Sequence, residues 1–350
     1  MSNGVGVRRG RYLRGVIALG VVAVLLAAAL VATVGSLNRD VYSAGGFVRQ
    51  YLDALADHDT ATALALPGIR PSAADLEADG LPADLPDTLL RDSVLGSLTD
   101  IELVSDEAGT GESSHIHTVT YAFAVDGQKS EMAFTVERVG NVAGVFDTWG
   151  FVTSPLAVLR VNVLHDATFT VNGLTLDTRA HAAEDAPVSF SNQAAYLAFA
   201  PTLYTVSHES VLLTAAEQAV PVVASGAVDI AVDAAPNETF TGQVQAKLDE
   251  YLDECATQEV LLPSNCPFGI EIDNRVRSAP EWSIADYPDV ALTAGEDSFD
   301  MPATPGQAHI VVDVQSLYDG SRDTRDEDVP FSVGLSVTIQ GDGALAIQLR

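Results

Sequence analysis

The alternation of apolar and polar positions divides the chain into parts with different periods. Residues 15–34 form an apolar run without a charged residue, in which only Thr33 is polar. At a rise of about 1.5 Å per residue, this run makes a helix of about 30 Å, the thickness of a bilayer's hydrocarbon core. The pattern predicts one transmembrane helix, followed by a linker over residues 35–42.

Helical periodicity follows this linker. Ser43 can cap a helix in which Phe47, Tyr51 and Leu55 recur every four residues, with charged residues on the other face. A further helix is predicted over residues 86–98.

Strand-like runs come next, with expected turns at Asp126-Gly127 and Gly140-Asn141. They occupy residues 99–104, 115–125, 131–139 and 144–152. Helices followed by a meander of antiparallel strands predict an α+β domain over residues 43–153.

Two phrases in this region carry a family resemblance. Residues 47–66 read FVRQYLDALADHDTATALAL, and the last strand-like run contains FDTWGFV. Over about residues 41–153 the pattern resembles the nuclear transport factor 2-like superfamily, particularly its exported bacterial members. The resemblance implies a cone fold, in which helices pack into the mouth of a bent four-stranded sheet and leave a conical pocket.

Residues 154–227 change to short strand-like runs separated by turns such as Asn172-Gly173, which predicts a small β-sandwich. The phrases FTVNGLTL and FAPTLYTVS within it resemble small β-domains of membrane-anchored envelope proteins. Residues 228–239 are expected to be a linker.

Residues 240–350 predict a second α+β domain. A helix is expected over residues 240–256, and residues 331–340 alternate strictly between apolar and polar side chains, as an antiparallel strand does. Residues 308–318 and 345–349 supply further strands. Because this order repeats that of residues 43–153, a second cone-fold unit is an alternative reading.

Charge is distributed unevenly along the chain. Four arginines and no acidic residue occupy the first 14 positions, and the remaining residues carry 14 basic against 48 acidic side chains, a net charge of −34. A body this acidic repels nucleic acid, so no nucleic-acid partner is expected. Lysine occurs only at positions 129 and 247, a composition typical of actinobacterial proteins.

The basic residues also predict the orientation of the helix. Residues 1–14 form a short cytoplasmic tail, and its arginines place the body outside the cell by the positive-inside rule: Arg8, Arg9, Arg11 and Arg14. The alternative is a cleaved signal peptide, with Ala27-Ala28-Ala29 as a possible cleavage site. An apolar run longer than a signal's usual 7–15 residues favours a retained anchor.

The only two cysteines, Cys255 and Cys266, predict a disulfide in an extracytoplasmic body. No histidine lies within 40 residues of either one, so a zinc site built on them is not expected.

Candidate ligand-pocket residues lie in the first domain. His115 and His117 stand two apart on one predicted strand, where two imidazoles can bind a metal or line a pocket, but no third metal ligand is identifiable. Asp147 with Tyr121 would suit acid–base work if the carboxylate lay in an apolar cavity, and Trp149 is the neighbouring aromatic residue. The simpler interpretation is a strand end, an edge aspartate and a core tryptophan.

The sequence contains none of the common catalytic or nucleotide-binding motifs, and no cofactor or metal is expected. The acidic run of residues 319–328 does not fit a calcium loop and is expected to be a solvated loop.

These patterns favour a non-catalytic, membrane-anchored binding or scaffolding protein of the cell envelope, similar in architecture to TcaA-like envelope proteins. Its partners would be envelope proteins or cell-wall polymer. The alternatives are a ligand-binding or enzymatic pocket in the first domain, and an accessory subunit of a membrane complex.

Overall fold

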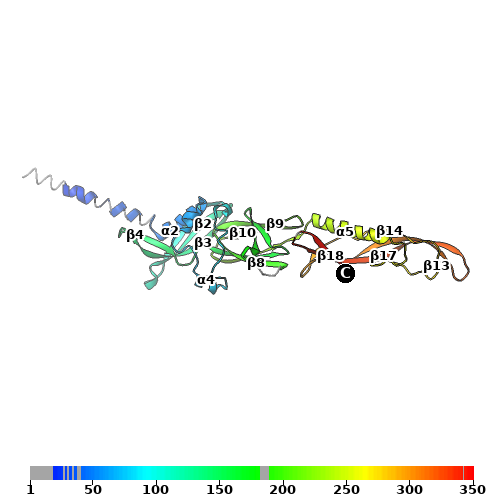
Figure 1. Cartoon of the computed structure of the whole chain (residues 1–350). Coiled ribbons are helices and arrows are strands. Elements are labelled where there is room, and N and C mark those ends of the chain that lie inside the picture. The colour runs from blue at the N-terminus through cyan, green and yellow to red at the C-terminus, as the bar shows by residue number, and fades with distance from the viewer. Residues whose placement is uncertain are drawn as a thin grey trace, which may run out of the picture.

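A computed structural model of the chain describes residues 19–26, 28–29, 31–33, 35–37, 41–181, 189–341 and 343–350. The molecule is elongated (Figure 1). An apolar helix projects from one end, a helix-covered sheet and a pair of smaller sheets follow, and a sheet covered by a long helix forms the other end. The protein is therefore a mixed α+β protein built mostly of strands.

The N-terminal helix runs over Leu19–Leu37, with a mean hydropathy of 2.4, and none of its most apolar window is buried. By length and composition it can cross a membrane, which agrees with the predicted span. The four N-terminal arginines lie outside the described residues.

Three helices with side-chain caps begin the first part of the body. The hydroxyl oxygen of Ser43 accepts a hydrogen bond from Gly46 N (2.9 Å) and caps the first of them, as the sequence predicted. Asp59 and Ser72 cap the two that follow. The helices are α2 (Ala44–Ala56), α3 (Thr60–Leu64) and α4 (Ala73–Ala78).

A four-stranded antiparallel meander lies against α2. It consists of β1 (Leu98–Ala108), β2 (Ile116–Val125), β3 (Gln128–Val142) and β4 (Phe146–Phe151) in that order. The predicted turn at Asp126-Gly127 is confirmed. The predicted turn at Gly140-Asn141 is wrong, because both residues pair with β4 and the chain turns at Ala143-Gly144. Both residues have positive φ (54° and 71°), as the central residues of a type I′ turn do, and Val145 completes the three-residue loop between β3 and β4.

The helix predicted over residues 86–98 is also wrong, since only a 3₁₀ turn, η1 (Asp92–Val94), forms there. Besides a few short turns of its own, the backbone of this segment bonds to distant residues. Leu197 N donates to Pro86 O (3.0 Å), and Asn172 Nδ2 donates to Val94 O (2.6 Å). Tertiary contacts thus replace the hydrogen bonds of a helix.

Two sheets form the middle of the molecule, in agreement with the β-rich pattern. One has the order β11-β5-β8, from β5 (Ala157–Leu164), β8 (Ser191–Ala198) and β11 (Gly226–Asp233). The other has the order β12-β10-β9-β6-β7, from β6 (Thr168–Val171), β7 (Leu174–Asp177), β9 (Thr202–Glu209), β10 (Leu213–Val222) and β12 (Ala235–Pro236).

β11 and β12 occupy most of the segment expected to be a linker, residues 228–239, and a helix begins at Glu238. β11 pairs in parallel with β5 over eight residues, and Ala235 and Pro236 pair with β10. The linker interpretation failed because its short apolar run, flanked by Asp and Pro, does not reveal a partner strand some 70 residues earlier in the chain.

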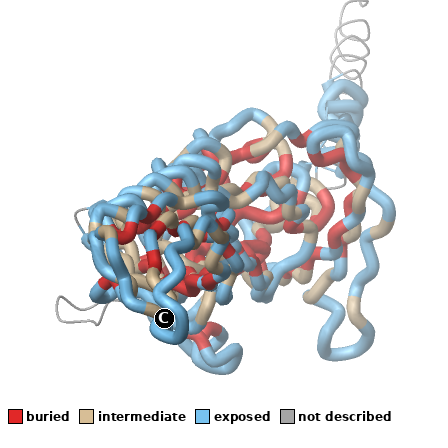
Figure 2. Tube along the Cα trace, turned by 90° about the vertical axis from the view of Figure 1, so that its right-hand side faces the viewer, coloured by how far each residue is buried: buried red, intermediate tan, exposed pale blue. Residues whose placement is uncertain are grey.

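The buried residues form two hydrophobic cores, and Figure 2 shows them enclosed by exposed chain. The first core runs without a break from α2 to Val232, so the first sheet and the middle sheets share it. Tyr51 of α2 is fully buried and donates a hydrogen bond to Ala200 O (2.8 Å) across this junction. The second core lies under the C-terminal helix.

That helix, α5 (Glu238–Ala256), begins at Asn237, whose side chain accepts a hydrogen bond from Phe240 N. It buries Phe240, Val244, Leu248 and Leu252. Its sheet has the order β13-β16-β17-β18, and two further strands pair with β16. The strands are β13 (Arg275–Val276), β14 (Glu281–Asp286), β15 (Thr293–Ala294), β16 (Phe299–Gln315), β17 (Arg322–Ile339) and β18 (Leu345–Leu349).

The predicted strands of this part are confirmed, but the acidic run of residues 319–328 is not a loop. From Arg322 onward it belongs to β17 and pairs with β16, beginning at Gln315 opposite Arg322. Charged side chains did not prevent a strand here because most of this part of β17 is exposed to solvent.

Candidate functional site

The interior of the first part of the body is filled by aromatic side chains. Phe47 and Tyr51 of α2 meet Phe151 of β4, with ring centroids 4.9 and 5.5 Å apart. Phe134 of β3 lies 6.2 Å from Tyr51. Rings therefore occupy the space where the cone-fold resemblance implies a pocket.

Tyr121 points into this interior. It is only 4% exposed, and its hydroxyl donates a hydrogen bond to Gly45 O (2.9 Å). Burial raises the pKa of Tyr121 above its usual value of 10. The side chain therefore stays protonated and serves to hold α2 on β2.

The two candidate histidines differ in their surroundings. His115 lies exposed in the turn before β2, so it does not share a strand with His117 as expected. His117 Nδ1 lies 2.5 Å from Asp106 Oδ1, and its ring meets Trp149 at 4.8 Å in an edge-on arrangement. Among the residues that the structure describes, no three His, Cys, Asp or Glu side chains are grouped so that they could hold a metal ion.

Asp106, the hydrogen-bond partner of the candidate His117, is not predicted by the sequence. The predicted strand ended at residue 104, whereas β1 continues to Ala108, which lies opposite His117. The register shifts twice along β1, so counting by two from the apolar positions cannot reveal this pairing.

Asp147 and Trp149 lie at an open groove of about 780 Å³ between α2 and β4. Asp147 stands 3.7 Å from Arg138 Nη1, and Trp149 Nε1 donates to Tyr42 O (2.9 Å). His115, His117 and Tyr121 do not line this groove. Two of the five candidates thus line the groove, and His117 contacts one of them, Trp149, without lining it.

Several charged side chains of this groove already have partners. Arg49 Nε donates to Asp53 Oδ1 (2.7 Å), and its Nη1 donates to Ile101 O (2.6 Å). Hydrogen bonds from Thr62 lower the pKa of the Asp59 carboxyl, which therefore stays ionised. A general acid needs the opposite shift, so Asp59 suits binding better than proton transfer.

A second groove, of about 580 Å³, lies between α5 and the edge strand β18. Its lining is mostly apolar and includes Leu248, Leu335, Leu345 and Ile347. Lys247 at its margin pairs with Glu250 (2.7 Å). No sequence pattern indicates this groove, because its two walls on α5 and β18 lie about 100 residues apart in the chain.

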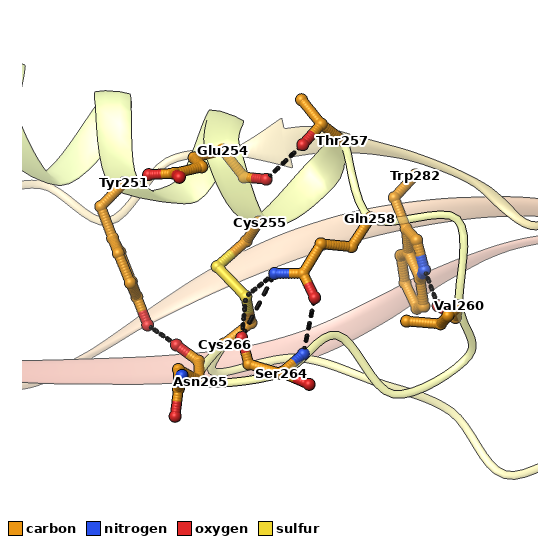
Figure 3. Close-up of a disulfide and its surroundings, with 10 residues drawn as sticks. All are labelled: Tyr251, Glu254, Cys255, Thr257, Gln258, Val260, Ser264, Asn265, Cys266 and Trp282. Atoms are coloured by element: carbon orange, nitrogen blue, oxygen red, sulfur yellow. Dashed lines mark hydrogen bonds between the residues drawn. A yellow bond between two sulfur atoms is a disulfide. The ribbon is translucent and has the colours of Figure 1, made fainter.

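The predicted disulfide between Cys255 and Cys266 is present, with the two Cα atoms 5.8 Å apart. It ties the end of α5 to the loop that follows (Figure 3). In this loop Gln258 Nε2 donates to Ser264 O, and Ser264 N donates to Gln258 Oε1. Trp282 Nε1 donates to Val260 O (2.8 Å). A formed disulfide indicates an oxidising compartment.

No protein-family model, no curated protein and no solved structure matches this chain. Its class therefore rests on its own features: a mixed α+β, mostly β protein with an apolar N-terminal helix and one disulfide.

Proposed function

We propose that this protein is a membrane-anchored, extracytoplasmic binding or scaffolding protein of the bacterial cell envelope. The observation that carries the proposal is the apolar helix Leu19–Leu37, which projects from one end of an elongated body (Figure 1). Such an arrangement suits a tether that holds binding surfaces away from the bilayer. The disulfide supports an oxidising location for the body.

A binding role is favoured over catalysis by the state of the candidate residues. Aromatic rings fill the interior of the first part, and Asp147 is half-exposed beside Arg138. A catalytic carboxylate in the cone fold would instead need an apolar cavity that raises its pKa. The packing of α2 on the meander β1–β4 also supports the proposed likeness to the nuclear transport factor 2-like superfamily.

Membrane attachment and orientation are tested with the full chain and with a chain that begins at residue 41. We expect the full chain in carbonate-washed membranes, the shortened chain in the soluble fraction, and digestion of the body by protease added to intact spheroplasts. Protection of the body from that protease would contradict the proposed orientation. N-terminal sequencing of the mature protein distinguishes a retained anchor from a cleaved signal.

The binding role is tested by crosslinking intact cells and purifying the full chain. We expect envelope proteins or wall polymer to co-purify. Recovery of the chain alone would count against scaffolding.

A further inference from the structure

The end of the molecule farthest from the apolar helix carries an unusual group of basic residues. There the hairpin of β16 and β17 lies beside β13 (Figure 1). In the loop of this hairpin, Leu317 is 69% exposed and Tyr318 is fully exposed. We call Arg275, Arg277, Arg322 and Tyr318 together the distal site.

The sheet register brings its arginines together. Arg275 on β13 and Arg322 on β17 both lie opposite Gln315 of β16, one on each side. Their side chains therefore share a face of the sheet, with Cα atoms two strand spacings, about 10 Å, apart. Arg277 and Arg322 line one open cleft of about 600 Å³.

These three guanidinium groups differ from most other basic groups of the body. Among the described residues, no carboxylate oxygen lies within 4.0 Å of any of them. Most other basic side chains of the body do pair with a carboxylate: Arg49, Arg70, Arg138, Arg160, Lys247, Arg325 and Arg350.

Two acidic residues of this region bond to hydroxyl groups instead. Asp313 accepts a hydrogen bond from Thr324 Oγ1 (2.7 Å), and Asp319 accepts one from Ser321 Oγ (2.8 Å). Asp323 also lines the cleft. In a chain with 48 acidic residues, three neighbouring arginines without an ion pair leave their forked donors open to an external anion.

We propose that the distal site binds an anionic polysaccharide, with the arginines on its carboxylate or phosphate groups and the Tyr318 ring against a sugar face. An exposed aromatic ring offers a flat apolar surface with a polar edge, which suits a sugar ring. Arginines spaced along a sheet suit a charge that repeats along a polymer. This inference rests on the proposed extracytoplasmic function, since it requires the site to face the cell wall.

The acidity of the rest of the body does not prevent such binding. At physiological salt the screening length is about 8 Å, so carboxylates farther away act weakly on a bound anion.

The test measures binding of the full chain in detergent to four probes: polygalacturonate, poly(glycerol phosphate), neutral dextran and poly-glutamate. We expect one of the first two to bind in a salt-sensitive manner, and which one binds identifies the anion. Arg275→Gln, Arg277→Gln and Arg322→Gln combined should weaken that binding at least tenfold, since even one lost hydrogen bond to a charged group is worth about a factor of ten. Tyr318→Ala should weaken it by a smaller factor, and Leu317→Ala should not.

The matched control combines Arg70→Gln, Arg91→Gln and Arg160→Gln, which removes the same charge from exposed positions elsewhere. It should retain binding. Equal loss in both triple variants, equal binding of dextran, or tighter binding of poly-glutamate than of either anionic polysaccharide would overturn the proposal. If no polysaccharide binds the full chain, while the variant without the three arginines of the distal site still co-purifies the same envelope partners, this inference fails and the proposed function stands.

Discussion

At the scale of single residues, burial and hydrogen bonding decide what each candidate side chain can do. Tyr121 and Trp149 have the residue types of a pocket, but each donates its only polar hydrogen to a backbone carbonyl of the segment 42–45. His117 is likewise held by Asp106 and Trp149. These residues therefore fasten the start of α2 to the sheet.

Buried tyrosines predict a loss of stability in alkali. Burial raises the pKa of Tyr196 to about 12, and it also raises the pKa of Tyr51 and of Tyr204. Above pH 10 the unfolded chain releases these protons while the folded chain keeps them. The unfolded state then binds fewer protons, so the free energy of unfolding falls as pH rises from 10 through 12.

Tyr196→Phe tests this effect and should change the free energy of unfolding little at neutral pH, because the Tyr196 hydroxyl has no hydrogen-bond partner within the described residues. Urea unfolding at pH 7 should change by less than about 1 kcal/mol. Between pH 10 and 11.5 the variant should lose stability less steeply than the wild type. Parallel pH profiles of the two proteins would refute the assignment.

At the scale of elements, close backbone contacts fix how the short helices join the first sheet. Gly68 follows α3 with a φ of +75°, and a Cβ placed there would lie 2.1 Å from Phe151 O. Beside it, Phe151 N donates to Pro67 O (2.9 Å). The chain can approach β4 this closely only without a side chain at position 68.

Gly68→Ala should therefore destabilise the protein more than Gly80→Ala. Gly80 has nearly the same φ (+71°), but a Cβ placed there would have no other atom within 4 Å. Gly80→Ala should cost about 1–2 kcal/mol for the left-handed backbone alone. Gly68→Ala adds a clash with the backbone of β4, so its urea midpoint should fall further. Equal midpoints would show that the contact with Phe151 is unimportant.

At the scale of the whole molecule, two hydrophobic cores suggest two cooperative units. The first core joins α2, its sheet and the middle sheets, and the second joins α5 to the last sheet and also includes Leu213 at the start of β10. The chain has two tryptophans, and each core contains one, Trp149 in the first and Trp282 in the second. Each unit therefore has its own fluorescent reporter.

Removing the disulfide should affect only the second unit. The variant Cys255→Ser with Cys266→Ser frees a loop with a sequence separation of 11, which should lower the free energy of unfolding by about 3 kcal/mol in the chain-entropy model. In a Trp149→Phe background, fluorescence should report a lower midpoint. With Trp282→Phe, the remaining signal should keep its midpoint. Equal shifts in both backgrounds would indicate a single cooperative unit.

Local signals predicted those elements that depend on neighbouring residues. The capped helix α2, the Asp126-Gly127 hairpin, the alternating strand β17 and the cysteine pair were all readable in this way. The failures occurred where a partner lies far away in the chain. Residues 86–98 lose their helix to bonds with the middle sheets, and residues 226–233 become a strand because β5 is available.

The apolar run, the acidic body, the cysteine pair and the α+β class follow from the sequence alone, because each depends on composition or on contacts between nearby residues. Tertiary structure decided which candidates meet, how the two cores divide the chain, and that Arg275 and Arg322 flank Gln315 at the far end. These outcomes depend on strand register and on long-range packing. The local period of a sequence does not encode either one.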